Sequence, residues 1–325
     1  MPLSFPPPVA GSFRNRIING NFDVWQRGAS FSIANSSYTW VADRWYISNV
    51  ASGVTAAITK VSAPPGFRGV NAINISANGV VAGAYFIIYH KFESQMVADL
   101  DGTNCAVSFD LHAETSHGSL SGIIELVHNT SLDDDSFATN LSHTGFSIPV
   151  GAGKVIVPLS ASQMAGAKLG MRIGIFLGQA GSSGNLNATF GAVQLERGTV
   201  ANAFEFRPLG IEMALCSRYY QTSYDLGVAP GSALAATGYS RIVDAMTSYA
   251  SLQCLFKAPM RVTPSISLFS NVTGASGKIR QVVAAADVAA GAIGISTTGF
   301  TAYVNSVSTL ATEQIFCAWT ADAEL

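Results

Sequence analysis

Residues 105–112 read CAVSFDLH, and along this stretch apolar side chains alternate with small or polar ones. That alternation is the period of a β-strand with one buried face. Residues 171–177, MRIGIFL, repeat it, and Gly- and Ser-rich turns separate such runs without a helical pattern after them. Many short strands in this arrangement predict an all-β fold, in the form of an antiparallel sandwich rather than a parallel sheet with crossover helices.

The composition limits the partners that the chain can have. Its 325 residues suffice for two domains of ordinary size, and 48% of them are apolar but only 12% are charged, about half the usual share. Because Lys and Arg number 18, the net charge is −2 and no basic run exists, nucleic-acid binding is not expected. A surface with so few charges is typical of proteins whose identical copies cover one another, so we expect a closed homo-oligomer.

The mean hydropathy of +0.31 raises the question of membrane insertion. Three asparagines interrupt the longest uncharged apolar stretch, residues 69–90, and Asp287 interrupts residues 282–295. Neither stretch offers the ~20 predominantly apolar residues of a spanning helix, so no insertion is expected. The opening sequence MPLSFPPP lacks the basic and apolar regions of a secretory signal, which indicates synthesis in the cytoplasm.

The cysteines predict neither a disulfide framework nor a metal centre. Four are present, without CxxC spacing, and they lie in apolar runs. We therefore predict free, buried thiols. They are Cys105, Cys216, Cys254 and Cys317.

Changes in pattern along the chain suggest four parts. Residues 1–14 form a Pro-rich arm, either an attachment peptide or a solvated terminus, and residues 15–208 form the first sandwich. Ile211, Leu215 and Tyr219 lie four apart, so residues 209–226 are expected to form a short helix or an extended linker. Residues 227–325 return to alternating strands and form a second, smaller β-sandwich, in which Pro259 and Pro264 bracket a break between strands.

The residues that would carry catalysis are not apparent. Glycoside hydrolysis needs two carboxylates on opposite sides of a bond, and Asp133-Asp134-Asp135 is the only acidic cluster. Adjacent loop residues cannot flank a bond in this way, so we predict no enzyme. The same three carboxylates could form a calcium loop, or simply a solvated acidic turn. No cofactor is expected apart from this possible calcium ion.

The aromatic residues suggest a binding role, because sugars stack their apolar faces on Trp and Tyr rings. Trp25 and Trp45 stand in alternating contexts and are predicted to pack in the core. Tyr38 and Trp40, beside the polar residues 35–37, are the candidates for an exposed glycan-binding platform.

Several separated segments resemble one family. They are residues 15–28 (NRIINGNFDVWQRG), 42–45 (ADRW), 193–198 (VQLERG), 201–208 (ANAFEFRP), 212–220 (EMALCSRYY) and 259–264 (PMRVTP). In this order they are similar to the tail fibre and appendage proteins of tailed bacteriophages. The resemblance implies a jelly roll like that of carbohydrate-binding modules, a small C-terminal β domain and a homotrimer in the virion tail. The N-terminal arm would then contact other virion proteins, and a host surface glycan would be the receptor.

Simple physics also gives the motif residues structural roles. Residues 22–25 are expected to form a strand after a turn at Asn19-Gly20. Arg44 and Arg207 could each bind a carboxylate, with Asp43 or Glu196 as the acceptor, and so hold the first and last strands of the domain together.

Three functions follow in order of preference. The first is non-catalytic attachment to a host glycan by a tail fibre or short appendage. The second is a head-decorating fibre or structural adhesin on the capsid. The third is a polysaccharide depolymerase, ranked last because paired carboxylates are not apparent.

Overall fold

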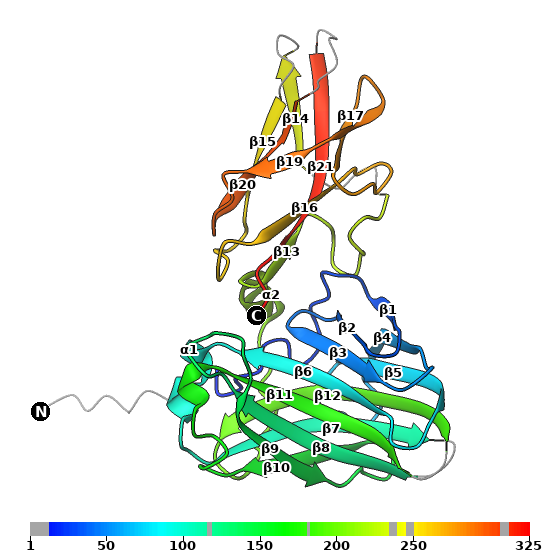
Figure 1. Cartoon of the computed structure of the whole chain (residues 1–325), viewed down its shortest axis with the longest axis vertical. Coiled ribbons are helices and arrows are strands. Elements are labelled where there is room, and N and C mark those ends of the chain that lie inside the picture. Colours follow the sequence, from blue (N-terminus) through cyan, green and yellow to red (C-terminus); the bar gives the residue numbers. More distant parts are fainter. Residues whose placement is uncertain (1–12, 116–118, 181–182, 234–238, 245–249, 306–311) are drawn as a thin grey trace, which may run out of the picture. The chain divides into compact units, whose positions relative to one another are not determined.

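The computed structural model describes residues 13–115, 119–180, 183–233, 239–244, 250–305 and 312–325. The chain divides into two compact units, shown in Figure 1. Unit 1 holds residues 13–23, 30–41 and 45–207, and unit 2 holds residues 24–29, 42–44 and 208–325. The proposed N-terminal arm, residues 1–14, lies outside the described residues except for its last two.

Unit 1 is a sandwich of two six-stranded antiparallel sheets (Figure 1). Sheet A has the order β1 (Ser30–Ile33), β4 (Ala56–Ser62), β5 (Asn71–Val80), β12 (Gly184–Arg197), β7 (Cys105–Thr115) and β10 (Gly153–Leu159). Sheet B has the order β2 (Ser37–Trp40), β3 (Trp45–Val50), β6 (Tyr85–Phe92), β11 (Met171–Ala180), β8 (Ser119–His128) and β9 (Thr139–Phe146). Short helical turns follow β6 and β10: α1 (Ser94–Val97), η1 (Ala98–Leu100) and η2 (Ala167–Leu169).

The alternation seen in the sequence produces this sandwich. Val107, Phe109 and Leu111 on β7 are fully buried, as are Ile173 and Ile175 on β11. Because successive side chains of a strand point to opposite faces, each strand contributes every second residue to the space between the sheets. The predicted all-β jelly-roll sandwich is therefore confirmed.

The first and last segments of unit 1 are joined by polar contacts. The Asn15 side chain accepts the N–H groups of Ile17 and Leu195, both at 3.0 Å, and donates to the carbonyl of Val193 at 3.1 Å. Arg207 donates to the backbone carbonyls of Ile17, at 3.0 Å, and of Asn15. Because buried backbone groups need partners, these bonds fix where the chain enters and leaves the unit.

Two details of the expected contacts need correction. Arg207 holds the first segment through backbone carbonyls, and its nearest carboxylate is Glu205 at 3.6 Å rather than Glu196. Glu196 pairs instead with Arg14 at 3.0 Å. The strand predicted over residues 22–25 is wrong, because Phe22 has a φ of 52° and the chain cannot stay extended through that conformation.

The last segment of unit 2 opens with α2 (Leu209–Ser217), so residues 209–226 contain the short helix that was one of the two predicted alternatives. Its larger sheet is built on β21 (Thr312–Asp322), which pairs with four strands: β13 (Tyr220–Thr222), β14 (Tyr239–Asp244), β16 (Ser265–Phe269) and β17 (Lys278–Gln281). β18 (Ala286–Ala289) extends that sheet beside β17. A smaller sheet has the order β15 (Ala250–Leu255), β20 (Gly299–Val304) and β19 (Gly291–Ile293). The break predicted around Pro259 and Pro264 is confirmed, since it falls between β15 and β16.

Unit 2 also contains a buried cluster of charges drawn from distant parts of the chain. The guanidinium of Arg44 lies 3.5 Å from the centroid of the Tyr219 ring and bonds to the carboxylate of Glu324. The guanidinium of Arg27 lies 3.6 Å from the Tyr220 ring and 3.3 Å from Glu324. Cations over aromatic faces and paired with carboxylates can remain charged away from water.

Asp43, the carboxylate expected to bind Arg44, has other partners in this cluster. It lies 3.9 Å from Arg27 and accepts the backbone N–H of Gln26 at 2.7 Å. Burial raises the pKa of Asp43 to about 6, although Arg27 opposes that shift.

The predicted burial of the aromatic and sulfur-containing residues is confirmed. Trp25 and Trp45 are 0% and 1% exposed, and all four cysteines are buried and free of disulfides. The Trp45 indole N–H donates to the carbonyl of Asn19 at 3.0 Å. Within the described residues, no helix is long and apolar enough to cross a bilayer.

Candidate carbohydrate-binding face

The outward face of sheet B carries aromatic side chains in cross-strand rows, and we call it the aromatic face. Residues opposite one another on paired strands point to the same side, so the register of the strands defines each row. The first row consists of Trp40, Tyr46, Tyr89, Gly174, Glu125 and His143. The second row consists of Tyr38, Ser48, Ile87, Phe176, Ile123 and Gly145, and the third of Val50, Tyr85, Gly178 and Ser121.

The rings of these rows contact one another from β2 to β11. Ring centroids are 5.0 Å apart between Trp40 and Tyr46, and 4.8 Å apart between Tyr46 and Tyr89, which stack. Phe176 continues the series at 6.2 Å from Tyr89 and 5.6 Å from Tyr85. With Ile87 these five rings form a hydrophobic cluster. We call the series from Trp40 to Tyr85 the ring ladder.

A glycine makes the centre of the ladder possible. A Cβ atom at Gly174 would lie 2.7 Å from Cε1 of Tyr89 and 3.1 Å from a methyl carbon of Ile87. Contacts that short do not occur, so a side chain at this position would displace the ring. The absence of a side chain on β11 therefore leaves the space beside Gly174 that the Tyr89 ring occupies.

Charged groups border the ladder along β11 and β8. The guanidinium of Arg172 lies 4.5 Å from the Tyr89 ring centroid and donates to Glu125 at 2.9 Å. His143 Nε2 lies 3.5 Å from the other oxygen of Glu125. Burial raises the pKa of Tyr46 to about 12, although Arg172 opposes that shift, so its hydroxyl is neutral at physiological pH. A guanidinium, a carboxylate and an imidazole thus stand beside the ring ladder.

The two aromatic residues singled out from the sequence both belong to this face. Tyr38 is 70% exposed, and its ring centroid lies 6.2 Å from that of Tyr46. Trp40 is partly exposed and begins the ring ladder. The structure therefore brings these two predicted residues together, and joins to them Tyr85, Tyr89 and Phe176, which sequence reasoning did not single out.

The three acidic residues proposed as a calcium loop do not converge. Asp133 accepts two bonds from Ser94, its backbone N–H at 2.6 Å and its hydroxyl at 2.8 Å. Asp134 bonds to neighbours in its own loop, and Asp135 lies 3.0 Å from Lys91. Across the described part of the chain, no group of three His, Cys, Asp or Glu side chains could hold a metal ion. This geometry gives the calcium hypothesis no support.

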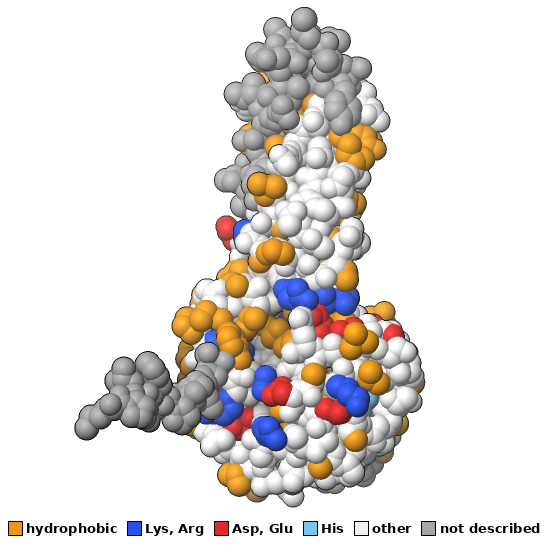
Figure 2. All heavy atoms as spheres, turned by 90° about the vertical axis from the view of Figure 1, so that its left-hand side faces the viewer, with side chains coloured by type: hydrophobic (Ala, Val, Ile, Leu, Met, Phe, Trp, Pro, Cys, Tyr) orange, Lys and Arg blue, Asp and Glu red, His pale blue; other side chains and the backbone are white. Residues whose placement is uncertain are grey.

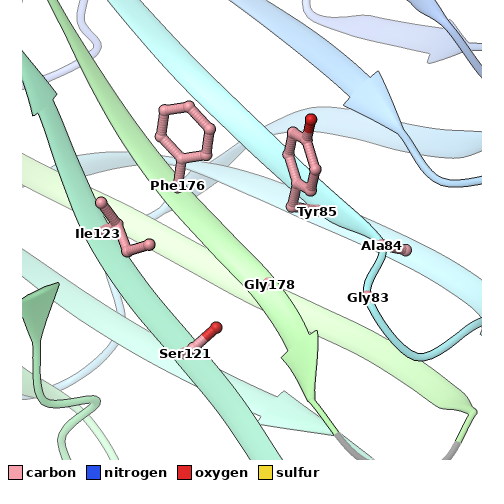
Figure 3. A pocket seen from close by; sticks show the side chains of 7 residues that line it. All are labelled: Gly83, Ala84, Tyr85, Ser121, Ile123, Phe176 and Gly178. Carbon is pink, nitrogen blue, oxygen red and sulfur yellow. The ribbon is translucent and has the colours of Figure 1, made fainter. Parts of the chain in front are cut away.

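A pocket of about 330 Å³ opens on the aromatic face at the end of the ring ladder. Its lining consists of Gly83, Ala84, Tyr85, Ser121, Ile123, Phe176 and Gly178. In Figure 3, β11 passes beneath it at Gly178, with Tyr85 on one side and Ile123 and Ser121 on the other. None of the lining side chains carries a charge at physiological pH.

Comparison with known proteins gives likeness of fold only. No family model and no curated protein matches the chain. Solved structures similar to it include TmCBM61 in complex with β-1,4-galactotriose, at 13% identity and a TM-score of 0.35, over 57% of this chain and 99% of that one. Another is the enzymatically active domain of bacteriophage CBA120 tailspike protein 4, at 10% identity and a TM-score of 0.36, over 56% of this chain and 21% of that one.

A third is a carbohydrate-binding module of the β-sandwich superfamily, at 11% identity and a TM-score of 0.35, over 54% of this chain and 60% of that one. These scores are too low for any of the three to support a residue-level assignment.

Proposed function

We propose that this chain is a bacteriophage virion protein, a tail fibre or short appendage, that attaches to a glycan of the host surface without cleaving it. Attachment takes place on the aromatic face of unit 1. The observation that carries the proposal is the ring ladder, which runs across four strands with its rings on one side of the sheet.

The chemistry of this face suits a sugar chain. Pyranose rings present C–H groups on one face and hydroxyls around the edge, so they bind to aromatic rings flanked by hydrogen-bonding groups. Here Arg172, Glu125 and His143 stand in or beside the ladder's rows and can contact hydroxyls. Since neighbouring strands are ~4.8 Å apart, a ladder from β2 to β11 is roughly 15 Å long. That length accommodates several linked sugars.

The location in a virion rests on the ordered motifs from residue 15 to residue 264, which resemble those of phage tail fibres. Three of these motif segments supply the buried cluster of unit 2, where Arg27, Arg44 and Tyr219 meet Glu324. Immuno-electron microscopy of the particles tests this part of the proposal. Label at the tail supports a tail fibre, and label on the capsid supports the head-decorating fibre instead.

We further propose a homotrimer. Figure 2 shows a face on which charged side chains form only small groups of mixed sign among uncharged surface. Unit 2 exposes large apolar side chains, among them Leu255 at 60%, Val283 at 54% and Ile293 at 46%. Identical copies would cover such groups. Three copies would also raise the avidity of weak single sites by as much as about 10²–10⁴-fold. Light scattering that finds only monomers would contradict this proposal.

A glycan array tests attachment. The intact protein should bind a subset of glycans, and Tyr38→Ala should weaken that binding about tenfold, because the lost ring is exposed and contributes contact area. Ile156→Ala, an exposed residue on the outward side of sheet A, is the matched control and should bind like the wild type. Equal binding by all three proteins would contradict attachment at this face.

The enzymatic alternative has its own readout. The carboxylate in the rows of the aromatic face, Glu125, is already shared between Arg172 and His143. Incubation with host envelope polysaccharide should therefore leave its chain length unchanged. Release of oligosaccharides would establish a depolymerase in place of a purely adhesive protein.

A further inference from the structure

The pocket at the end of the ring ladder has a lining that suits one type of sugar substituent. Its walls are the carbon surfaces of Phe176, Tyr85 and Ile123, and its base is the backbone of Gly178. At about 330 Å³ it lies at the lower end of small-ligand sites, which is room for one sugar residue rather than a chain.

The pocket's polar groups are two neutral hydroxyls, those of Ser121 and Tyr85. Among the residues that the structure describes, neither hydroxyl is engaged in a hydrogen bond. A ligand can therefore use both without first breaking a hydrogen bond to a described residue. Because no lining side chain is ionised, a charged substituent would lose its hydration without gaining an ion pair.

The glycines shape the pocket. A Cβ atom at Gly178 would lie 2.9 Å from Oγ of Ser121, so any side chain there would occupy the base and displace this hydroxyl. Gly83 has a φ of +82°, a conformation that residues with side chains rarely adopt. The lining thus leaves space open where ordinary strand residues would fill it.

The pocket is continuous with the proposed glycan site. The Phe176 ring belongs to both, since its centroid lies 6.2 Å from that of Tyr89 in the ladder and 5.6 Å from that of Tyr85 in the pocket wall. A glycan lying on the ladder would thus bring one of its residues, or a substituent of it, to the pocket.

We propose that this pocket selects glycans in which that residue carries an acetyl group. The methyl of the acetyl group would lie against Phe176, Tyr85 and Ile123. The carbonyl oxygen of the same group would accept a hydrogen bond from the Ser121 hydroxyl. A bare sugar hydroxyl offers no methyl group to the apolar walls, and a carboxylate or an amine brings a charge that nothing in the pocket pairs. The proposal rests on glycan attachment at the aromatic face and adds the class of sugar that it prefers.

Matched oligosaccharides test the preference by calorimetry. Tetramers of β-1,4-linked glucose and of β-1,4-linked N-acetylglucosamine differ only in the substituent at C2. A glucomannan carrying O-acetyl groups, before and after alkaline deacetylation, tests the ester form. We expect the wild type to bind the acetylated member of at least one pair about tenfold more tightly, through one buried methyl and one hydrogen bond. The pair that responds identifies the N-acetyl or the O-acetyl form.

Ser121→Leu should fill the pocket and abolish the preference, while affinity for the unacetylated member stays within about twofold. Ser121 is exposed and makes no described contact through its hydroxyl, so folding should be retained. Ser76→Leu, on the outward side of β5 in sheet A, is the matched control and should keep the wild-type preference.

Two results would overturn the inference while leaving glycan attachment in place. One is equal affinity of the wild type for both members of each pair. The other is an acetyl preference that survives Ser121→Leu. Binding to none of these probes and to no glycan of an array would overturn attachment and the acetyl preference together.

Discussion

The two sheets of unit 1 share a core but differ completely on their outward faces. On sheet A the central rows hold Thr59, Asn74 and Thr189, and on sheet B the corresponding places hold rings. Asn74 donates to Asn187 at 2.8 Å and to the hydroxyl of Thr189 at 2.9 Å. The polar side chains of sheet A thus satisfy one another, whereas the rings of sheet B pack on one another, with Tyr46 and Tyr89 buried and the remaining rings partly or well exposed. Inward positions determine the sandwich, and outward positions are free to become a binding surface.

The largest effect is expected when a residue type typical of the outward face of sheet A is placed on the outward face of sheet B. Gly174→Thr introduces at the centre of the ladder the residue type that Thr189 supplies on β12. Its Cβ would lie 2.7 Å from the Tyr89 ring, so the ring must move and stability should fall by about 1–3 kcal/mol. Glycan affinity should fall at least about tenfold, since a displaced Tyr89 also shifts the rings that it contacts and about 1.4 kcal/mol of lost contact is tenfold in affinity. Calorimetry and chemical denaturation measure the two effects.

The matched control for that substitution is Gly210→Thr on α2 in unit 2, outside the aromatic face. No atom would lie within 4 Å of a Cβ at Gly210, so the new side chain meets open space. Affinity and stability should both stay close to wild type. If Gly174→Thr also binds normally, the ring ladder is not the binding surface.

The second test concerns the charge beside the ladder. Arg172→Lys keeps the positive charge but loses the planar fork that contacts Glu125 at 2.9 Å and the Tyr46 hydroxyl at 3.5 Å. Affinity should fall about tenfold. Arg280→Lys in unit 2, where the arginine pairs with Asp287 at 3.3 Å, should leave binding unchanged. A normal affinity for Arg172→Lys would show that the fork does not position the glycan.

The third test uses alkaline pH to measure how strongly the aromatic face disfavours ionisation of Tyr46. The pKa of Tyr46 is about 12 in the folded chain and about 10 when unfolded, so the folded state disfavours ionisation. Its contribution to stability is complete below pH 10 and is lost as the pH rises through about 12. By pH 11 the loss from this group is about 1 kcal/mol.

Tyr46→Phe removes that loss. The difference in unfolding free energy between wild type and variant should therefore be constant from pH 7 to 9 and should change by about 1 kcal/mol by pH 11. Denaturant titrations at each pH measure it. A difference that stays constant up to pH 11 would show that Tyr46 ionises equally in both states.

The smallest effect is expected on sheet A. Asn74→Ala removes the bonds to Asn187 and Thr189, and the unfolding free energy should fall by only about 1 kcal/mol because Asn74 is partly exposed. Glycan affinity should stay within twofold of wild type. A clear loss of affinity would show that the polar face also binds sugar, and the contrast between the sheets would then no longer hold.

The sequence predicted the fold class because alternation is a local signal. Within a few residues, the alternation of apolar and other side chains shows which face of a strand is buried. Examples are Val107 and Phe109 on β7, and Ile173 and Ile175 on β11. The pairing of β11 with both β6 and β8 is not local, since it joins residues 43 to 93 positions apart. No short pattern specifies those partners.

The same limit explains which site residues were found. Tyr38 and Trp40 stand out because polar neighbours surround them. Tyr85 and Tyr89 alternate with Phe86 and Ile88, so β6 is apolar on both faces. A strand of this kind indicates that the outward face of its sheet is also covered or binds a partner. Their alignment with Phe176 depends on the register of β11, and the role of Gly174 depends on a ring from another strand. Neither can be read from adjacent residues.

The partners of Arg27 set an order in which the protein can be completed during synthesis. Arg27 lies 297 positions before its partner Glu324, and β21, the strand that pairs with four others, comes just before that glutamate. While the ribosome is still translating, residues 24–29 and 42–44 have left the exit tunnel but their carboxylate and strand partners do not yet exist. Unit 1 has all its strands by residue 197, so it can fold first, while Arg27 and Arg44 are still solvated.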